Sequence, residues 1–232
     1  MAITAILAMT KEEIHSVSST PQRYAFLGCH FSSTGQGLAG LPSSLPSGCG
    51  LIIDDRNPPK TFNIQVVLQQ LRELDPAYLI LDFQRPSTEN TLVLTKELTV
   101  LPCPVVLPPD YGKDLHCPVF LPPIPPHISV YEYLRPWKDR EVWLELALDA
   151  TEITVTAGGS QIRSFPHAES AENAHRDSML HCHYKISRDG DALTFYCYRN
   201  KKDVEDLLSA LPPNISHAVG LFQELGECVV GR

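Results

Sequence analysis

The sequence predicts an α/β protein built as a small, irregular (β/α)8 barrel. Short apolar runs recur along its 232 residues, and such runs are typical of parallel strands buried on both faces. Helix-patterned stretches separate several of the runs. Polar residues or prolines end most of them, as expected where barrel strands open into loops. The predicted strands are 24–31, 51–53, 78–81, 104–107, 118–121, 142–148 and 218–222.

The clearest unit is a strand, a helix and a second strand within residues 50–83. We expect the helix to begin after a cap at Thr61 and to end at Asp75-Pro76, because proline disfavours helix in the residue before it. Since a helix joins the two strands, they should lie parallel in one sheet. The apolar residues of the helix fall on a single face: Ile64, Val67, Leu68, Leu71 and Leu74.

Other segments extend this pattern. Residues 2–9 fit either a short strand or the first turns of a helix. Helices are expected at about 88–98 and 201–211, and a brief one at 131–137. Asn200 with Asp203 resembles a capping box at the start of the helix at 201–211.

Residues 151–200 interrupt the barrel pattern. Alternating apolar residues at 151–165 predict an antiparallel hairpin, and a second pair of strands flanks Asp189-Gly190. Residues 168–179 are polar and favour a helix. We therefore expect an α+β insertion at 151–200 within a single barrel domain spanning 1–232.

A rim of polar residues should stand where the predicted strands end. In parallel barrels, chemistry takes place at the C-terminal ends of the strands. If the strands are parallel, these side chains emerge on one common rim. They are His30, Asp54, Asp55, Asp82, Gln84, Asp110, Glu145, Asp149, Gln223 and Glu224.

Within this rim, the candidates for acid–base chemistry are Asp54, Asp82 and Glu145. Asp54 or Asp55 can face the mouth beside Asp82 and bind a sugar hydroxyl or a metal, or else cap its loop and pair with Arg56. Asp82 and Gln84 share one side of their strand and can contact a ligand or satisfy each other. Glu145 interrupts an apolar run, so burial would raise its pKa; the alternative is that its strand is exposed on one face.

Bulk properties restrict the partners. A net charge of −8, from 19 basic and 27 acidic residues, argues against a nucleic-acid partner. No segment is predicted to span a membrane. The seven cysteines are odd in number and form no Cys-x-x-Cys pair, which favours a soluble, cytoplasmic protein without disulfides. We expect no cofactor and no metal, since His181-Cys182-His183 lacks the usual spacing of zinc ligands.

The stretch at 75–84, Asp-Pro-Ala-Tyr-Leu-Ile-Leu-Asp-Phe-Gln, resembles the signature strand of glycoside hydrolase family 18. Chitinases and spore-cortex-type lysins of that family carry Asp-Gly-x-Asp-x-Asp-Phe-Glu. The end of the chain, Phe222-Gln223-Glu224-Leu225-Gly226, is similar to the closing strand of the cortex-lytic branch. The resemblance implies a barrel that binds carbohydrate at its mouth.

The departures from that family also carry an implication. Asp82 keeps one family carboxylate, but Gln84 stands where the family has the Glu that protonates the leaving group, and an amide cannot donate that proton. Ile80 and Ala77 replace the earlier carboxylates, and Gln223 stands where the family has an aromatic residue. The resemblance therefore implies an inactive relative.

Three functions remain open from the sequence. The first is a non-catalytic barrel that binds a carbohydrate or glycan fragment. The second is an active hydrolase that uses Asp54 or Asp82 together with Glu145. The third is a scaffold whose insertion binds a protein. The candidate ligand-binding residues are Asp54, Asp55, Asp82, Gln84, Tyr111, Phe222, Gln223 and Glu224, with Tyr111 and Phe222 expected to stack on sugar rings.

Overall fold

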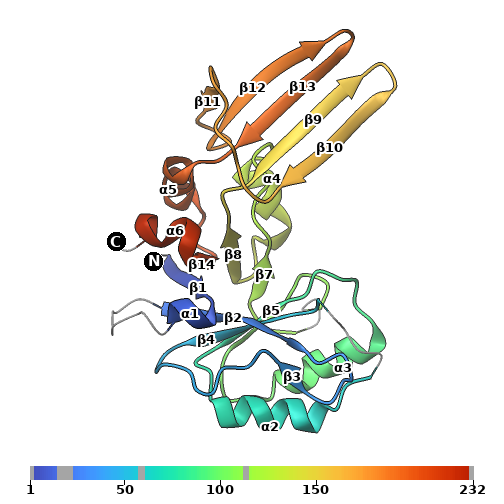
Figure 1. Cartoon of the computed structure of the whole chain (residues 1–232), viewed down its shortest axis with the longest axis vertical. Helices are drawn as coiled ribbons and strands as arrows, with labels where there is room; N and C mark the ends of the chain where they lie inside the picture. Colours follow the sequence, from blue (N-terminus) through green and yellow to red (C-terminus); the bar gives the residue numbers. More distant parts are fainter. Residues whose placement is uncertain (1–2, 15–22, 57–60, 112–114, 230–232) are drawn as a thin grey trace.

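A parallel barrel and an antiparallel sheet beside it make up the fold (Figure 1). The computed structural model describes residues 3–14, 23–56, 61–111 and 115–229. The barrel has eight parallel strands with helices outside them, and the antiparallel sheet is inserted before the last barrel strand. The predicted α/β barrel with an insertion is therefore confirmed.

The barrel strands pair in the order β6-β5-β4-β2-β1-β14-β8-β7. A parallel bridge between Leu107 and Val119 joins the two ends of this order, with the Phe120 amide donating to the Leu107 carbonyl at 2.8 Å. A short strand of two residues, β3 (Leu38–Ala39), pairs antiparallel with β2. The barrel strands are β1 (Thr4–Met9), β2 (Arg23–Phe31), β4 (Gly50–Asp54), β5 (Leu79–Asp82), β6 (Val105–Val106), β7 (Val119–Leu121), β8 (Val142–Leu146) and β14 (Ile215–Leu221).

The two ends of the chain meet in the barrel, since β1 lies between β2 and β14. The ambiguous segment at 2–9 is thus a strand. Its side chains alternate, with Ile6 and Ala8 in one core and Leu7 and Met9 in others. The last strand was predicted at 218–222; it starts earlier and ends at Leu221, and Phe222 begins a helix instead.

Six α-helices and one 3-10 helix lie among the described residues, and none is long and apolar enough to cross a membrane. The predicted cap at Thr61 is wrong, because the Asn63 side chain caps this helix by accepting from the Val66 amide at 3.4 Å. The predicted capping box of Asn200 and Asp203 is confirmed. The helices are α1 (Lys11–Ile14), α2 (Ile64–Leu74), α3 (Glu89–Leu98), α4 (Val130–Leu134), η1 (Arg135–Trp137), α5 (Lys201–Ala210) and α6 (Phe222–Val229).

Alternate residues of the barrel strands pack into different cores. One set fills the space inside the barrel, and it includes Ile52, Ile80, Phe120 and Trp143. The residues between them, such as Leu79 and Leu81, pack outward with the helices. Burial on both faces explains why these strands are continuous apolar runs.

The insertion is an antiparallel sheet in the order β10-β9-β13-β12-β11. The helix expected at 168–179 is wrong. The Asp177 carboxylate accepts from the amides of Met179 and Leu180, which forms a turn where a helix would need to continue. The insertion strands are β9 (Ala150–Thr156), β10 (Gly159–Phe165), β11 (His175–Asp177), β12 (Cys182–Asp189) and β13 (Ala192–Tyr198).

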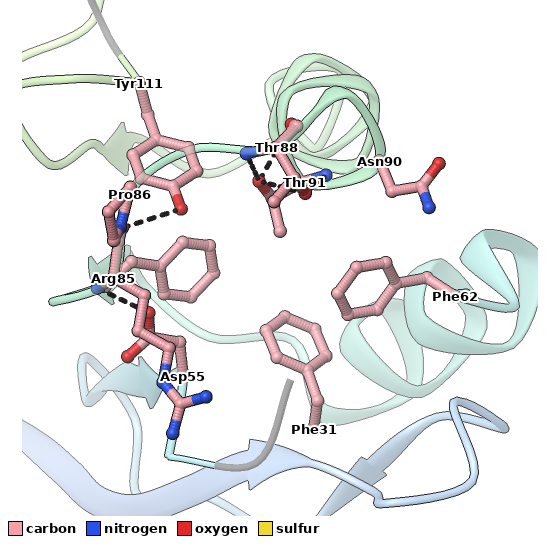
Figure 2. Close-up of a pocket in the computed structure, with 10 residues that line it drawn as sticks. Phe31, Asp55, Phe62, Arg85, Pro86, Thr88, Asn90, Thr91 and Tyr111 are labelled. Atoms are coloured by element: carbon pink, nitrogen blue, oxygen red, sulfur yellow. Dashed lines mark hydrogen bonds between the residues drawn. The ribbon is translucent and has the colours of Figure 1, made fainter. Parts of the chain in front are cut away.

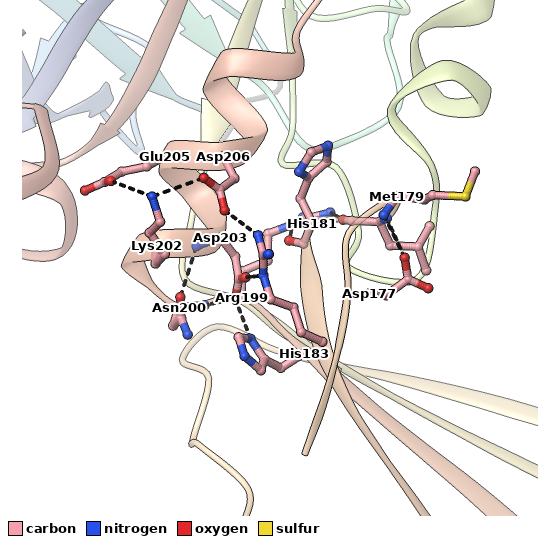
Figure 3. A network of polar contacts seen from close by, with 12 residues as sticks. Asp177, Met179, His181, His183, Arg199, Asn200, Lys202, Asp203, Glu205 and Asp206 are labelled. Atoms are coloured by element: carbon pink, nitrogen blue, oxygen red, sulfur yellow. Dashed lines mark hydrogen bonds and ion pairs between the residues drawn. The ribbon is translucent and has the colours of Figure 1, made fainter. Parts of the chain in front are cut away.

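A buried arginine ties the insertion to the barrel. Arg199 follows β13, and its guanidinium donates to the carbonyls of Leu180 at 3.2 Å and His181 at 3.1 Å (Figure 3). It also donates to the carbonyl of Ile124, which follows β7. One side chain therefore joins the base of the sheet to a barrel loop.

Candidate functional site

Strand register brings the predicted carboxylates to one end of the barrel. Ile52, Ile80 and Trp143 point into the barrel interior. Residues two positions further along a strand point the same way, and those positions hold Asp54, Asp82 and Glu145. Asp54 lies directly opposite Asp82 in the parallel ladder of β4 and β5. The common rim predicted for these strand ends is present.

Asp82 and Gln84 form a polar pair in the mouth. The Gln84 side-chain amide donates to Asp82 Oδ1 at 3.0 Å. Burial raises the pKa of Asp82; the hydrogen bond from Gln84 opposes this, and the charges of Asp54 and Asp55 add to it. The pair leaves the second carboxylate oxygen of Asp82 and the amide oxygen of Gln84 as acceptors for a ligand.

Glu145 has the most perturbed carboxyl group of the three. Burial raises its pKa from 4.5 to about 7, and the negative charges of Asp82, Asp149 and Glu224 contribute. Burial also raises the pKa of Asp149 to about 6, although the charge of Arg199 opposes this. A carboxylic acid with a pKa near neutrality can act as a general acid.

Asp54 and Asp55 have different roles. Arg56 Nε donates to both oxygens of Asp54, at 2.8 and 2.9 Å. Burial alone would raise the pKa of Asp54, but these hydrogen bonds outweigh it and lower the pKa. Asp55 is buried, and its oxygens accept the amides of Gln84 and Arg85 at 3.2 and 2.9 Å. Asp55 therefore fixes the loop that positions Gln84 instead of facing the mouth.

The remaining predicted residues lie away from Asp82. Tyr111 is buried, and its hydroxyl donates to the Arg85 carbonyl at 3.2 Å. Phe222 starts α6 and packs against the cores outside the barrel, while Gln223 is exposed on that helix. Glu224 accepts from the Leu148 amide and pairs with His167, both at 3.3 Å. The structure thus does not bring the two expected stacking residues to the mouth.

A small pocket of about 200 Å³ opens beside Asp82 and Gln84. Its apolar wall comes from Phe120 and from prolines at the ends of β6 and β7, Pro108, Pro109 and Pro122. Sequence analysis missed Phe120 as a site residue because it lies within an apolar run. Its position, two residues before Pro122 and thus on the same side of the strand, was the available signal.

A second pocket, of about 400 Å³, lies outside the barrel between the strand ends and the starts of α2 and α3 (Figure 2). Four aromatic rings line it, from Phe31, Phe62, Phe83 and Tyr111. Their centroids are 4.8 to 5.6 Å apart in edge-to-face pairs. Tyr111 therefore belongs to this pocket and not to the one beside Asp82.

A third pocket, of about 420 Å³, lies at the base of the insertion, where Phe165 and Tyr196 supply aromatic surface. His167 also lines it and pairs with Glu224, whose charge acts on Glu145. This link places the pocket next to the acidic rim. Neither Phe165 nor Tyr196 was predicted as a site residue, because their contribution depends on how the insertion folds back.

Among the described residues, no group of three His, Cys, Asp or Glu side chains is arranged to hold a metal ion. In the His181-Cys182-His183 segment, His183 Nδ1 lies 2.7 Å from Asp203 Oδ2 instead, and Cys182 is buried. The six cysteines whose side chains are described are free thiols.

Comparison with solved structures identifies the type of barrel. The chain is similar to the spore cortex-lytic enzyme SleL of Bacillus cereus, with a TM-score of 0.52 and 9% identity over 99% of this chain and 74% of that one. It is also similar to a family 18 chitinase mutant from Cycas revoluta in complex with (GlcNAc)4, with a TM-score of 0.55 and 9% identity over 97% of both chains. No protein-family model and no curated protein matches. The chain therefore has a glycoside hydrolase family 18-like fold.

Proposed function

We propose that this protein is a non-catalytic barrel that binds a neutral, GlcNAc-containing glycan fragment at its mouth. The observation that carries the proposal is the Asp82–Gln84 pair beside Phe120, because acceptors and an apolar ring surface together are what a sugar requires. The chitinase with the similar fold was solved with bound (GlcNAc)4. By analogy of fold alone, the same class of ligand is the first to test here.

The identity of residue 84 supports binding without hydrolysis. By its resemblance to the family signature, Gln84 occupies the position of the acid that protonates the leaving group. Its amide donates to Asp82 and has no proton of suitable acidity to transfer. The acidic rim also disfavours anionic glycans, because its carboxylates repel negative charge; after burial, they are the further cause of the raised pKa of Glu145.

The third pocket extends the surface available to a longer glycan. Phe165 and Tyr196 line it, and aromatic side chains are suited to pack against the apolar face of a sugar ring. A pocket of about 200 Å³ beside Asp82 is smaller than the 300–1,000 Å³ typical of ligand sites. A glycan with one sugar in the pocket beside Asp82 and further sugars against the third pocket fits both the small volume of the first and the aromatic lining of the second.

Calorimetric titration with (GlcNAc)4 tests this proposal. We expect the wild type to bind with a dissociation constant below about 1 mM, and Asp82→Ala to weaken binding at least tenfold, about 1.4 kcal/mol. Glu73→Gln, an exposed change on α2, is the matched control and should bind like the wild type. Unchanged binding by a folded Asp82→Ala variant would contradict the proposal, as would no binding by the wild type.

One observation favours a second candidate, an active hydrolase. A pKa of about 7 leaves Glu145 half protonated at neutral pH, with Asp82 nearby to act as its partner. If this is the activity, mass spectrometry will detect shortened products from (GlcNAc)4 at pH 6. Glu145→Gln will then abolish them, whereas Gln84→Ala will not. If the wild type leaves the oligosaccharide intact over days, the binding function stands.

A further inference from the structure

The far end of the insertion sheet extends beyond the barrel (Figure 1). Its strand pairing determines which residues share a face, because side chains directly opposite each other in an antiparallel ladder point the same way. Ile162 lies opposite Ile153, Ile153 opposite Phe195, and Phe195 opposite Ile186. These four residues form an unbroken apolar row across β10, β9, β13 and β12.

A shorter apolar row, bounded by Ser160 on β10 and Arg188 on β12, lies beside the first. Val155 lies opposite Leu193, and each is two residues from a member of the first row on its own strand. The two rows together are called the apolar face hereafter: Ile153, Val155, Ile162, Ile186, Leu193 and Phe195.

The apolar face is open to solvent. The exposed fractions are 56% for Ile162, 50% for Ile186, 40% for Leu193 and 39% for Val155. The six side chains together present roughly 400 Å² of apolar surface, within the range of the largest patch on a typical soluble monomer, a patch that is often functional. Scattered exposed apolar residues need no explanation, but an apolar row that crosses four strands does.

The opposite face of the same strands is polar. It carries Thr154 opposite Thr194, with their hydroxyls 3.3 Å apart, and the charged residues Glu152, Arg163 and Lys185. This alternation is typical of an antiparallel sheet that packs on one face and is solvated on the other. The sequence therefore encodes a buried face that the single chain does not bury.

We propose that the apolar face packs against the apolar face of a second copy of this chain. Two copies would bury on the order of 1,000 Å² with their rims, near the lower end of specific interfaces. Sheets pack face to face at a spacing of about 10 Å. The same patch on both subunits satisfies the self-complementarity that a two-fold dimer requires.

Charge favours a second copy as the occupant. The chain has a net charge of −8, so most of its surface repels another copy. On the same side of β9, β10, β12 and β13, no strand residue is a carboxylate, and the one charged residue is Arg188, a cation opposite Leu193. A two-fold axis running across the strands also places the two barrels at opposite ends of the packed sheets, which leaves both mouths accessible.

Sedimentation velocity over roughly 1 to 500 µM tests the proposal with the full chain. We expect the wild type to shift from monomer to dimer with a dissociation constant in the micromolar range. The double variant Ile162→Lys with Ile186→Lys should stay monomeric throughout. The matched control, Gln161→Lys with Ser187→Lys, adds the same charge to the adjacent exposed positions on the polar face and should dimerise like the wild type.

Circular dichroism melts verify that both double variants fold. Hydrogen exchange then provides a second readout, with slower exchange in β9, β12 and β13 at high protein concentration. A wild type that remains monomeric at the highest concentration overturns the proposal. So does a folded Ile162→Lys, Ile186→Lys variant that still dimerises.

Discussion

The chemistry of the mouth depends on single carboxyl groups whose surroundings differ. Asp54 has Arg56 on both its oxygens and a lowered pKa. Glu145 is buried, is influenced by three other carboxylates, and has a pKa of about 7. At neutral pH, Asp54 is therefore ionised, whereas Glu145 at the same rim is about half protonated. Environments that separate pKa values in this way are a feature of functional sites.

We predict that Glu145→Gln changes how stability depends on pH. The pKa of Glu145 is higher in the folded state than its ordinary value of 4.5. The stability it contributes is therefore complete below about pH 4.5 and is lost as the pH rises through 7. Between pH 5 and pH 8.5, the free energy of unfolding of Glu145→Gln should therefore rise relative to that of the wild type by on the order of 2 kcal/mol.

Urea unfolding at both pH values measures this difference. Glu73→Gln serves as the control, because Glu73 is exposed on α2. It should follow the wild type at each pH. If the free energy of unfolding changes equally between the two pH values in Glu145→Gln and in the wild type, Glu145 is not buried as described.

At the scale of single elements, one glycine allows β4 to enter the barrel. A Cβ on Gly50 would lie 2.0 Å from the ring of Tyr78. That ring cannot move aside easily, because its hydroxyl donates to the Tyr24 carbonyl at 2.6 Å and it packs edge to face on Trp143. The strand therefore depends on glycine at this position.

We predict that Gly50→Ala lowers the free energy of unfolding by about 3 kcal/mol through overpacking. Gly158→Ala is the matched control, because its Cβ would meet only an ordinary contact at 3.7 Å. Thermal or urea unfolding of the two variants provides the comparison. Equal stability would mean that Tyr78 has room to shift.

The junction between barrel and insertion depends on Arg199. Arg199→Met would leave the carbonyls of Ile124, Leu180 and His181 without this donor. We expect a loss of about 3 kcal/mol at pH 8, because unpaired buried polar groups are costly. In the variant, Arg199 no longer lowers the pKa of Asp149. The loss should therefore be smaller at pH 5, where Asp149 is protonated and leaves no unpaired charge.

Urea unfolding at pH 5 and pH 8 measures both effects. Arg163→Met is the control, since Arg163 is exposed on β10. An Arg199→Met variant as stable as Arg163→Met would contradict the anchoring role.

For the molecule as a whole, we predict from this junction that barrel and insertion unfold together, as the expected single domain would. Cys29 in β2 and Cys182 in β12 are both buried, and burial raises the pKa of each thiol to about 12. Neither should react until its region opens. We predict that both thiols are labelled with the same opening free energy in native conditions.

Mass spectrometry of labelled peptides follows the two sites separately. Cys117, which is only partly buried, reports the faster reaction of a more accessible thiol. If Cys182 reacts well before Cys29 as urea rises, the insertion is an independent folding unit and the single-domain prediction is wrong.

Local sequence pattern predicted much of the barrel. Strands β4 and β5 and the helix between them were found because burial on both faces makes each strand a continuous apolar run. The same pattern located Asp54 and Asp82 at neighbouring strand ends. The helix expected at 168–179 failed because the side chain of Asp177 binds backbone amides that a helix would use.

By itself, the sequence determined the parallel α/β barrel, the place of the insertion and the acidic ends of the strands, because periodicity and burial act within a few residues along the chain. Only the tertiary structure decided that Asp54 faces the mouth while Asp55 binds the next loop. It alone placed Phe120 in the pocket beside Asp82 and Gln84 and arranged the apolar face across four strands. Those properties depend on contacts between residues far apart in sequence, so no local pattern contains them.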